Sequence, residues 1–178
     1  IFYNFKTILI FMKQIVVAFL FILIVVLFAN INFNRLPKNT EIDGLVVYKS
    51  ERKLVAFSKG KIVKSYRIAL GKSPIGAKLF QGDNKTPEGV YFINGRNGHS
   101  IAYKNLGISY PNSNDISNSK GKPTGGDIKI HGLMNNLWFI GNFHRFSDWT
   151  NGCIAINNFE MDELYNSVKI GTRIEIKP

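Results

Sequence analysis

The stretch His131–Ala155, HGLMNNLWFIGNFHRFSDWTNGCIA, holds the residues around which the rest of the chain is organised. It contains the single cysteine, Cys153, on the turn Thr150-Asn151-Gly152-Cys153. It begins with His131, directly after the strand-like run Asp127–Ile130. A thiol becomes a strong nucleophile when a neighbouring imidazole accepts its proton. The stretch therefore predicts a Cys–His pair that the fold must assemble across 22 positions of sequence.

The same two residues also have an ordinary structural interpretation. A lone cysteine is usually a small buried apolar residue, and a lone histidine is usually a hydrogen-bonded core or surface residue. The neighbouring glycines favour the catalytic interpretation. Gly152 permits a tight turn whose successive N–H groups face a developing oxyanion, and Gly132 permits close approach of the backbone to the imidazole.

This pattern resembles the signature of the L,D-transpeptidase (YkuD-type) catalytic domain family, a His-Gly pair followed by a Ser/Thr-x-Gly-Cys turn. Here the two parts are His131-Gly132 and Thr150–Ile154. A second block, Gly71–Gly76 followed by Gln81–Tyr91, fits the family's order and distance. The resemblance thus covers about residues 43–178, and two blocks in register are far more specific than one.

The resemblance implies a role for each catalytic residue. Cys153 is the nucleophile and His131 is its base, and the two stabilise each other as thiolate and imidazolium. The backbone carbonyl of Gly132 orients the imidazole in place of a carboxylate. We therefore expect a thiolate–imidazolium pair beside a carbonyl acceptor.

The turn supplies the expected oxyanion hole. The amides of Gly152 and Cys153, with Asn151 nearby, are the implied donors, and each contributes on the order of 3 kcal/mol. The hydroxyl of Thr150 is expected to stabilise the turn rather than to react.

The implied function is acyl transfer on peptidoglycan stem peptides through a Cys153 thioester, with an amine as acceptor. Two alternatives stay open. The same thioester hydrolysed by water gives an L,D-carboxypeptidase or a cross-link-cleaving amidase, and a silent site leaves a cell-wall binding module. Common family members carry His before the Gly-Cys pair and Arg or Asn two places after the cysteine, where this chain has Asn151 and Ala155. Losing these polar groups favours hydrolysis over transfer.

Composition limits the remaining possibilities. A chain of 178 residues, 45% hydrophobic, suits one catalytic domain with a core. The net charge of +11 suits an anionic membrane surface or an acidic polymer. Nucleic acid is the weakest partner, because the lysines are scattered and not interleaved with stacking aromatics. No metal-binding motif is present, and no cofactor is expected.

The N-terminus is the clearest change of composition. Ile15–Ala29 is a run of 15 apolar residues that follows Lys13. It reaches a membrane span of ~30 Å only by recruiting Ile8–Phe11 or Ile31–Phe33. Residues 1–29 are therefore expected to be a signal anchor or signal peptide, with anchoring in the inner membrane through residues 8–29 favoured because no good cleavage site follows. The domain would then lie in the periplasm or cell envelope.

The rest of the chain divides into a linker, residues 30–42, and a catalytic domain, residues 43–178. Short runs rich in β-branched and aromatic residues predict strands at 45–48, 54–57, 62–70, 89–94, 101–103, 107–110, 128–131 and 172–177. The Ser/Asn/Gly-rich segment 112–126 is expected to be a loop. The fold class is therefore mainly β, a β-sandwich or open barrel with one or two peripheral helices after an N-terminal hydrophobic segment.

Two segments are expected to be helical. Residues 136–144 are apolar and aromatic but poorly capped. Residues 158–168 have Asn157 as N-cap with Glu160 three positions on, an apolar face that includes Met161 and Leu164, and Gly171 as terminator.

For other polar and aromatic residues near the motif, a structural role is favoured over a functional one. Asp148 opens a turn, with orientation of His144 or Arg145 as its functional alternative. His144 and His99 are expected to be structural or surface residues. Trp138 and Trp149 are core or groove-wall residues, and the pattern does not separate the two.

Overall fold

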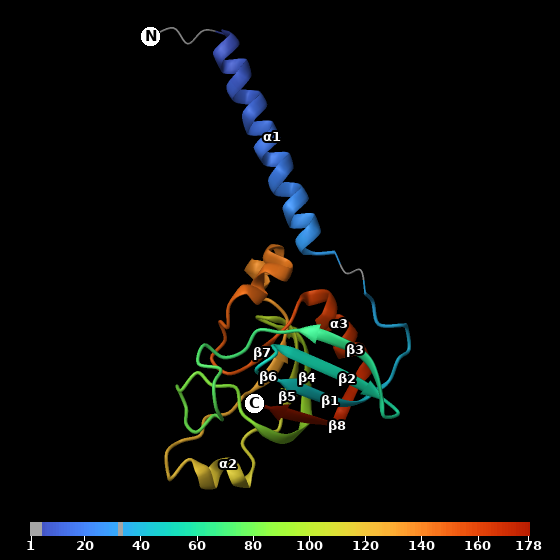
Figure 1. Ribbon diagram of the computed structural model, residues 1–178, viewed down its shortest axis with the longest axis vertical. Helices are drawn as coiled ribbons and strands as arrows, with labels where there is room; N and C mark the ends of the chain where they lie inside the picture. Colours follow the sequence, from blue (N-terminus) through green and yellow to red (C-terminus); the bar gives the residue numbers. More distant parts are fainter. Residues whose placement is uncertain (1–4, 32–33) are drawn as a thin grey trace.

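The computed structural model describes residues 5–31 and 34–178. A long N-terminal helix projects from one end of a mainly β domain (Figure 1). Residues 1–4 of the expected membrane segment and residues 32 and 33 of the expected linker lie outside the described residues.

Eight strands form one sheet in the order β3-β2-β1-β8-β4-β5-β6-β7. Their bounds are β1 Ile42–Tyr48, β2 Lys53–Ser58, β3 Lys61–Arg67, β4 Gly89–Ser100, β5 Tyr103–Ile108, β6 Lys129–His131, β7 Ile154–Ala155 and β8 Val168–Lys177. The predicted meander is confirmed in β1, β2 and β3, which pair antiparallel in sequence order. The strand signals at 101–103 and 107–110 flank a single strand, β5, and the two-residue β7 had no prediction.

The sheet curls until its two ends approach each other. Ala69, just beyond the edge strand β3, forms an antiparallel bridge with Ala155 in the opposite edge strand β7. Two backbone hydrogen bonds of 3.0 and 2.9 Å join Ala69 and Ala155. The open-barrel form of the predicted fold is therefore confirmed, as a single curled sheet and not two packed sheets.

The core lies inside this curl. Alternate residues of the strands point inward, as expected for a sheet with one buried face. The fully buried members include Leu45, Val47, Leu54, Tyr66, Tyr91, Ile93, Leu106, Ile130, Ile154 and Ile174. Helix α3 (Asn158–Ser167) covers the core with Met161 and Leu164, both completely buried.

The helical predictions need three corrections. The chain continues from α3 directly into β8 at Val168, so Gly171 lies within β8 and does not terminate the helix. The expected loop 112–126 contains a helix, α2 (Ser113–Asn118), because Asn112 caps its N–H groups and Asp115 accepts from the N–H of Asn112. The segment η1 (Asn135–Phe146) is helical as predicted, but it is a 3-10 helix with a kink at Gly141.

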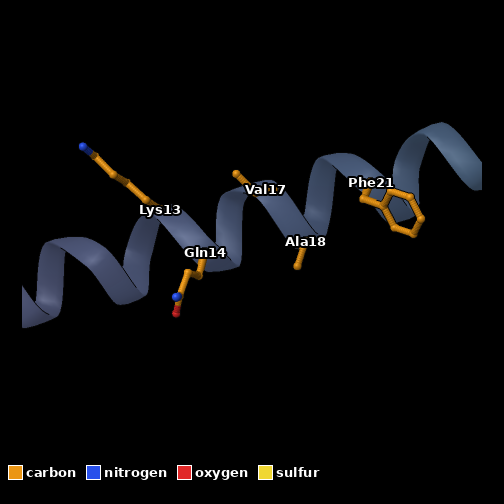
Figure 2. A pocket seen from close by; sticks show the side chains of 5 residues that line it. All are labelled: Lys13, Gln14, Val17, Ala18 and Phe21. Atoms are coloured by element: carbon orange, nitrogen blue, oxygen red, sulfur yellow. The ribbon is translucent and has the colours of Figure 1, made fainter.

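Helix α1 (Phe5–Ala29) has 25 residues and is long enough to cross a bilayer core, since ~1.5 Å per residue gives roughly 37 Å. It recruits Ile8–Phe11, at the cost of enclosing Lys13 and Gln14. Figure 2 shows five side chains that line a shallow hollow on this helix, with Lys13 extended toward the N-terminal end and Val17, Ala18 and Phe21 beyond it. A lysine in that position can carry its charge to the membrane surface.

Two residues of the predicted linker, Asn34 and Leu36, contact the domain. Leu36 is buried in the core cluster, and its N–H donates to the carboxylate of Glu163 in α3 at 3.0 Å. Lys64 in β3 donates to the carbonyl of Asn34 and forms a buried ion pair with Glu163. Asn34 and Leu36 are therefore held against α3 and β3.

Candidate active site

The candidate nucleophile and base lie on neighbouring parallel strands. In the register of β6 and β7, Ile130 pairs with Ile154 and His131 with Ala155. Side chains alternate between the two faces of a strand. Cys153, one residue before Ile154, therefore points to the same face as His131, while Ile130 and Ile154 point into the core.

On that face lies a cavity of about 450 Å³. Six of the residues that line it are Cys153, His131, Lys129, Trp149, Thr150 and Asn151. The structure thus brings together the predicted thiol and imidazole with two residues of the predicted turn. In residues 5–31 and 34–178, no three or more His, Cys, Asp or Glu side chains are grouped as metal ligands.

His131 is held in one orientation. Its Nδ1 lies 2.7 Å from the carbonyl oxygen of Gly132. A carbonyl only accepts, so Nδ1 carries the proton and Nε2 keeps a free lone pair. The ring packs edge-on against Trp149, with centroids 5.6 Å apart. Burial lowers the pKa of His131 below its ordinary value, against a smaller opposite effect of the Gly132 carbonyl.

The surroundings of Cys153 favour its neutral thiol. Its Sγ lies 3.7 Å from the carbonyl oxygen of Asp127, an acceptor for the S–H proton. Burial raises the pKa of Cys153, and a hydrogen bond from the backbone of Lys129 offsets only part of this rise. Because burial also lowers the pKa of His131, the free protein favours a neutral thiol and a neutral imidazole. The expected thiolate–imidazolium pair stays a prediction, and these two pKa shifts oppose its formation in the free protein.

The hydroxyl of Thr150 spans the turn. It donates to the carbonyl of Cys153 at 2.7 Å and accepts from the N–H of Gly152 at 3.1 Å. Gly152 has φ 133°, and a Cβ there would meet the carbonyl oxygen of Lys85 at 2.7 Å, so this position requires glycine. In the free protein the Gly152 N–H is thus used inside the turn.

The second motif block packs against this turn, which explains why the two occur together. The N–H of Lys72 donates to the carbonyl of Thr150 at 3.0 Å. A Cβ on Gly71 would lie 3.1 Å from the Cα of Gly152, so the two backbones touch. The ammonium of Lys72 donates to the side chain of Asn151 at 3.2 Å.

The alternative role of Asp148 is corrected. Its carboxylate accepts from Arg52 at 2.8 and 3.1 Å and from the N–H of Leu70 at 2.9 Å, so it fastens the turn to the sheet. Arg145 is paired instead with Glu160 in α3.

The two other histidines do not line the cavity. His144 is buried, and neither ring nitrogen has a hydrogen-bond partner among the described residues. Burial, with a smaller effect of Arg145, lowers the pKa of His144 to about 3. His99 is exposed on β4.

Several cavity residues were not anticipated from sequence. Lys129 lies two positions before His131, so strand alternation would have placed it on the same face. Trp149 is resolved as a wall of the cavity, whereas Trp138 lies outside it on η1. Lys72 had no local signal, because only the packing of the two blocks brings it to the site.

Comparisons with known proteins agree with this geometry. Residues 43–176 match the family described as the L,D-transpeptidase catalytic domain, YkuD. The putative L,D-transpeptidase YafK of Escherichia coli K12 is 29% identical over 128 residues, which are 68% of this chain and 45% of YafK. The chain therefore spans about half the length of the curated relatives it matches.

Solved structures share the fold. The helical cell shape determining protein Pgp2 from Campylobacter jejuni superposes with a TM-score of 0.59 at 24% identity, covering 78% of this chain and 48% of Pgp2. Bd1075 from Bdellovibrio bacteriovorus superposes with a TM-score of 0.55 at 24% identity, covering 79% and 49% of the two chains.

Proposed function

Because the chain belongs to the L,D-transpeptidase (YkuD) catalytic domain family, we propose that it modifies peptidoglycan as a cysteine acyltransferase acting on stem peptides. One observation carries the proposal. Cys153 and His131 lie on the same face of adjacent strands and line one cavity, with the imidazole held by Gly132 so that Nε2 is free.

The reaction begins from the neutral pair. As Sγ of Cys153 attacks the carbonyl carbon of the third residue of the stem peptide, Nε2 of His131 accepts the thiol proton. The resulting imidazolium then gives that proton to the departing amine of the D-residue, and the C–N bond breaks. A thioester on Cys153 remains. An amine of a second stem peptide attacks it, and the thiol is regenerated.

The developing oxyanion needs donors that the turn supplies. The N–H of Cys153 is the first donor, and Asn151 borders the same cavity. Gly152 joins them only if its N–H exchanges the hydroxyl of Thr150 for the oxyanion. Buried donors of this kind contribute on the order of 3 kcal/mol each to transition-state binding.

Hydrolysis is the second candidate, and the surroundings of Asn151 favour it. The Asn151 side chain is engaged by Lys72, and Ala155 is completely buried in β7, so neither reaches an incoming amine freely. Water needs little positioning. We therefore expect a higher ratio of hydrolysis to transfer than in members with His and Arg at these positions.

A donor–acceptor assay tests the function. The purified full chain is incubated with a tetrapeptide stem donor and excess amine acceptor, and mass spectrometry follows the protein adduct and both products. A thioester adduct on the native protein, absent from Cys153→Ser, is expected, with the free tripeptide exceeding the transfer product. A native protein that binds peptidoglycan but forms no adduct would instead be a binding module.

We further propose that the domain works in the cell envelope and that α1 anchors it to the inner membrane. The helix is mostly apolar, with Lys13 and Gln14 as polar interruptions, and its apolar side chains are mostly exposed, as a lipid-facing span requires. Flotation of the full chain with vesicles through a density gradient, compared with a chain lacking residues 1–29, tests this.

A further inference from the structure

Segment η1 presents an aromatic surface to the outside of the domain. Five of its apolar side chains are at least 40% exposed. These residues, named here the η1 patch, are Leu137, Trp138, Phe139, Phe143 and Phe146. Trp138 contacts Phe139 edge-on, and Phe143 stacks on Phe146 at 5.9 Å. Concentrated exposure of this kind marks an interaction surface, since isolated exposed apolar residues are ordinary but a contiguous group is not.

The η1 patch lies at the end of α1. Figure 1 shows η1, drawn in orange, at the base of α1, on the opposite end of the domain from α2. The side chain of Asn30 donates to the carbonyl of Phe139 at 3.1 Å. A Cβ on Gly141, whose φ is 46°, would lie 2.3 Å from the carbonyl oxygen of Ala29. Backbone therefore packs on backbone where the apolar helix ends.

The other end of η1 is fixed to the catalytic site. Asn135, its first residue, donates through its N–H to the carbonyl of Ile101 at 3.0 Å and through its side chain to Ser100 at 3.0 Å. Ser100, Ile101 and Met134 all line the cavity that contains Cys153. Segment η1 thus joins the rim of the cavity to the end of α1.

We propose that the η1 patch inserts into the interfacial layer of the bilayer that α1 spans, and so holds the cavity close to the membrane surface. This rests on the proposed anchoring by α1. The last apolar turn of α1 ends at Ala29, so the residues packed there lie at the depth of the lipid headgroups. Tryptophan favours that depth because it combines apolar area with a polar N–H, and Phe and Leu side chains form the buried apolar face of helices that lie in this layer. The five residues of the patch carry no charge, which suits lipid and not an acidic polymer.

The two tryptophans of the chain make a matched pair of probes. Trp149→Phe leaves Trp138 in the η1 patch as the only tryptophan, and Trp138→Phe leaves Trp149 in the cavity. Each full-length variant is reconstituted in phosphatidylcholine vesicles with acyl chains brominated near the headgroup end. Bromine should reduce the emission of Trp138 about twofold or more and leave that of Trp149 nearly unchanged, because quenching requires contact with the lipid.

A second pair of variants tests whether the quenching of Trp138 requires insertion of the η1 patch or results only from its closeness to α1. In the Trp149→Phe background, Phe146→Asp should weaken the quenching of Trp138, since a charge resists insertion. Ile170→Asp, which changes an exposed apolar residue of β8, should leave the quenching intact. Equal quenching in both would overturn the proposal.

The remaining outcomes are distinct. If the chain does not float with the vesicles, the anchor itself fails, whatever the adduct assay shows. If it floats but Trp138 is quenched by aqueous iodide and not by bromolipid, the η1 patch faces water and the proposal is overturned. If both quenchers fail on Trp138, a protein surface such as a second copy covers the patch, and the proposal is overturned.

Discussion

The two faces of the strand pair β6 and β7 have opposite compositions within a few residues. On one face, Ile130 and Ile154 are completely buried and pack in the core. On the other, His131 and Cys153 line the cavity with Lys129. The strands are short, and the same backbone hydrogen bonds position both sets.

Along these two strands, side chains that stabilise the core therefore alternate with side chains that line the cavity. The core face fixes the register, because a slip by one residue would exchange the two sets of side chains. The cavity face then inherits its geometry from that register. Substitutions on the two faces should therefore have separable consequences.

The largest difference in the free energy of unfolding is expected between substitutions of two adjacent residues, Ile154 and Cys153. Ile154→Ala removes a completely buried side chain and should lower the free energy of unfolding by about 2–5 kcal/mol. Cys153→Ala, one position earlier on the cavity face, should change it by less than about 1 kcal/mol. Chemical denaturation in detergent, followed by circular dichroism, measures both. Equal losses would show that the cavity face also carries the fold.

A pH series extends the comparison, because the core face of these strands has no titratable group, whereas His131 lies on their cavity face and a second buried imidazole, His144, lies on η1. The folded-state pKa of His144 is lowered to about 3, so the unfolded chain binds the proton more readily below pH ~6.5. Stability contributed by the neutral imidazole is thus present above that pH and lost as pH falls. The loss should reach about 2 kcal/mol between pH 6.5 and 5, and His131 acts in the same direction.

The matched controls for this series are histidine replacements. His144→Leu should flatten the dependence between pH 6.5 and 5, whereas His99→Leu, on an exposed side chain, should retain it. Thermal unfolding at each pH is the measurement. An unchanged slope in His144→Leu would contradict the assignment.

The turn between the two strands should respond more weakly. Thr150→Val keeps the shape but removes the hydroxyl that bonds Gly152 and Cys153, at a cost of about 1–2 kcal/mol. Thr150→Ser, which retains the hydroxyl, should recover most of this. If the Gly152 N–H is released to bind the oxyanion, Thr150→Val will also raise the acylation rate per folded molecule, measurable by adduct formation with stem peptide. Equal unfolding free energies for Val and Ser would mean that the hydroxyl does not hold the turn.

The smallest effect is expected for the base. His131→Gln should slow alkylation of Cys153 by iodoacetamide near neutral pH by about tenfold, since the neutral imidazole no longer accepts the thiol proton. His99→Gln should not. In the native protein the rate should keep rising into the alkaline range, because burial raises the pKa of the thiol. A larger reduction of the alkylation rate in His144→Gln would show that His144, and not His131, is the base.

The sequence was most informative where a feature depends on a few residues that are close together in the chain. The pair His131 and Cys153 followed from the spacing of glycines and a family motif, and α3 followed from Asn157 and Glu160. The same capping logic applied to Asn112 and Asp115 would have found α2. These features are encoded within a few residues, so they are accessible without the fold.

What escaped prediction depends on distant contacts. Lys72 reaches Asn151 only because two segments 79 positions apart pack together. The raised pKa of Cys153 follows from burial of the thiol, which cannot be read from the sequence. The strand β7 has two residues and exists only as the partner of β6 and of Ala69.

The place of β8 in the sheet has a consequence for the order of assembly. This last strand along the chain lies between β1 and β4, in parallel with β1 and antiparallel to β4. A chain that has emerged only as far as α3 lacks the strand that joins the two halves of the sheet. For the exported protein proposed above, we therefore expect Cys153 and His131 to stay unassembled on a translocating chain until Val168–Lys177 has crossed the membrane.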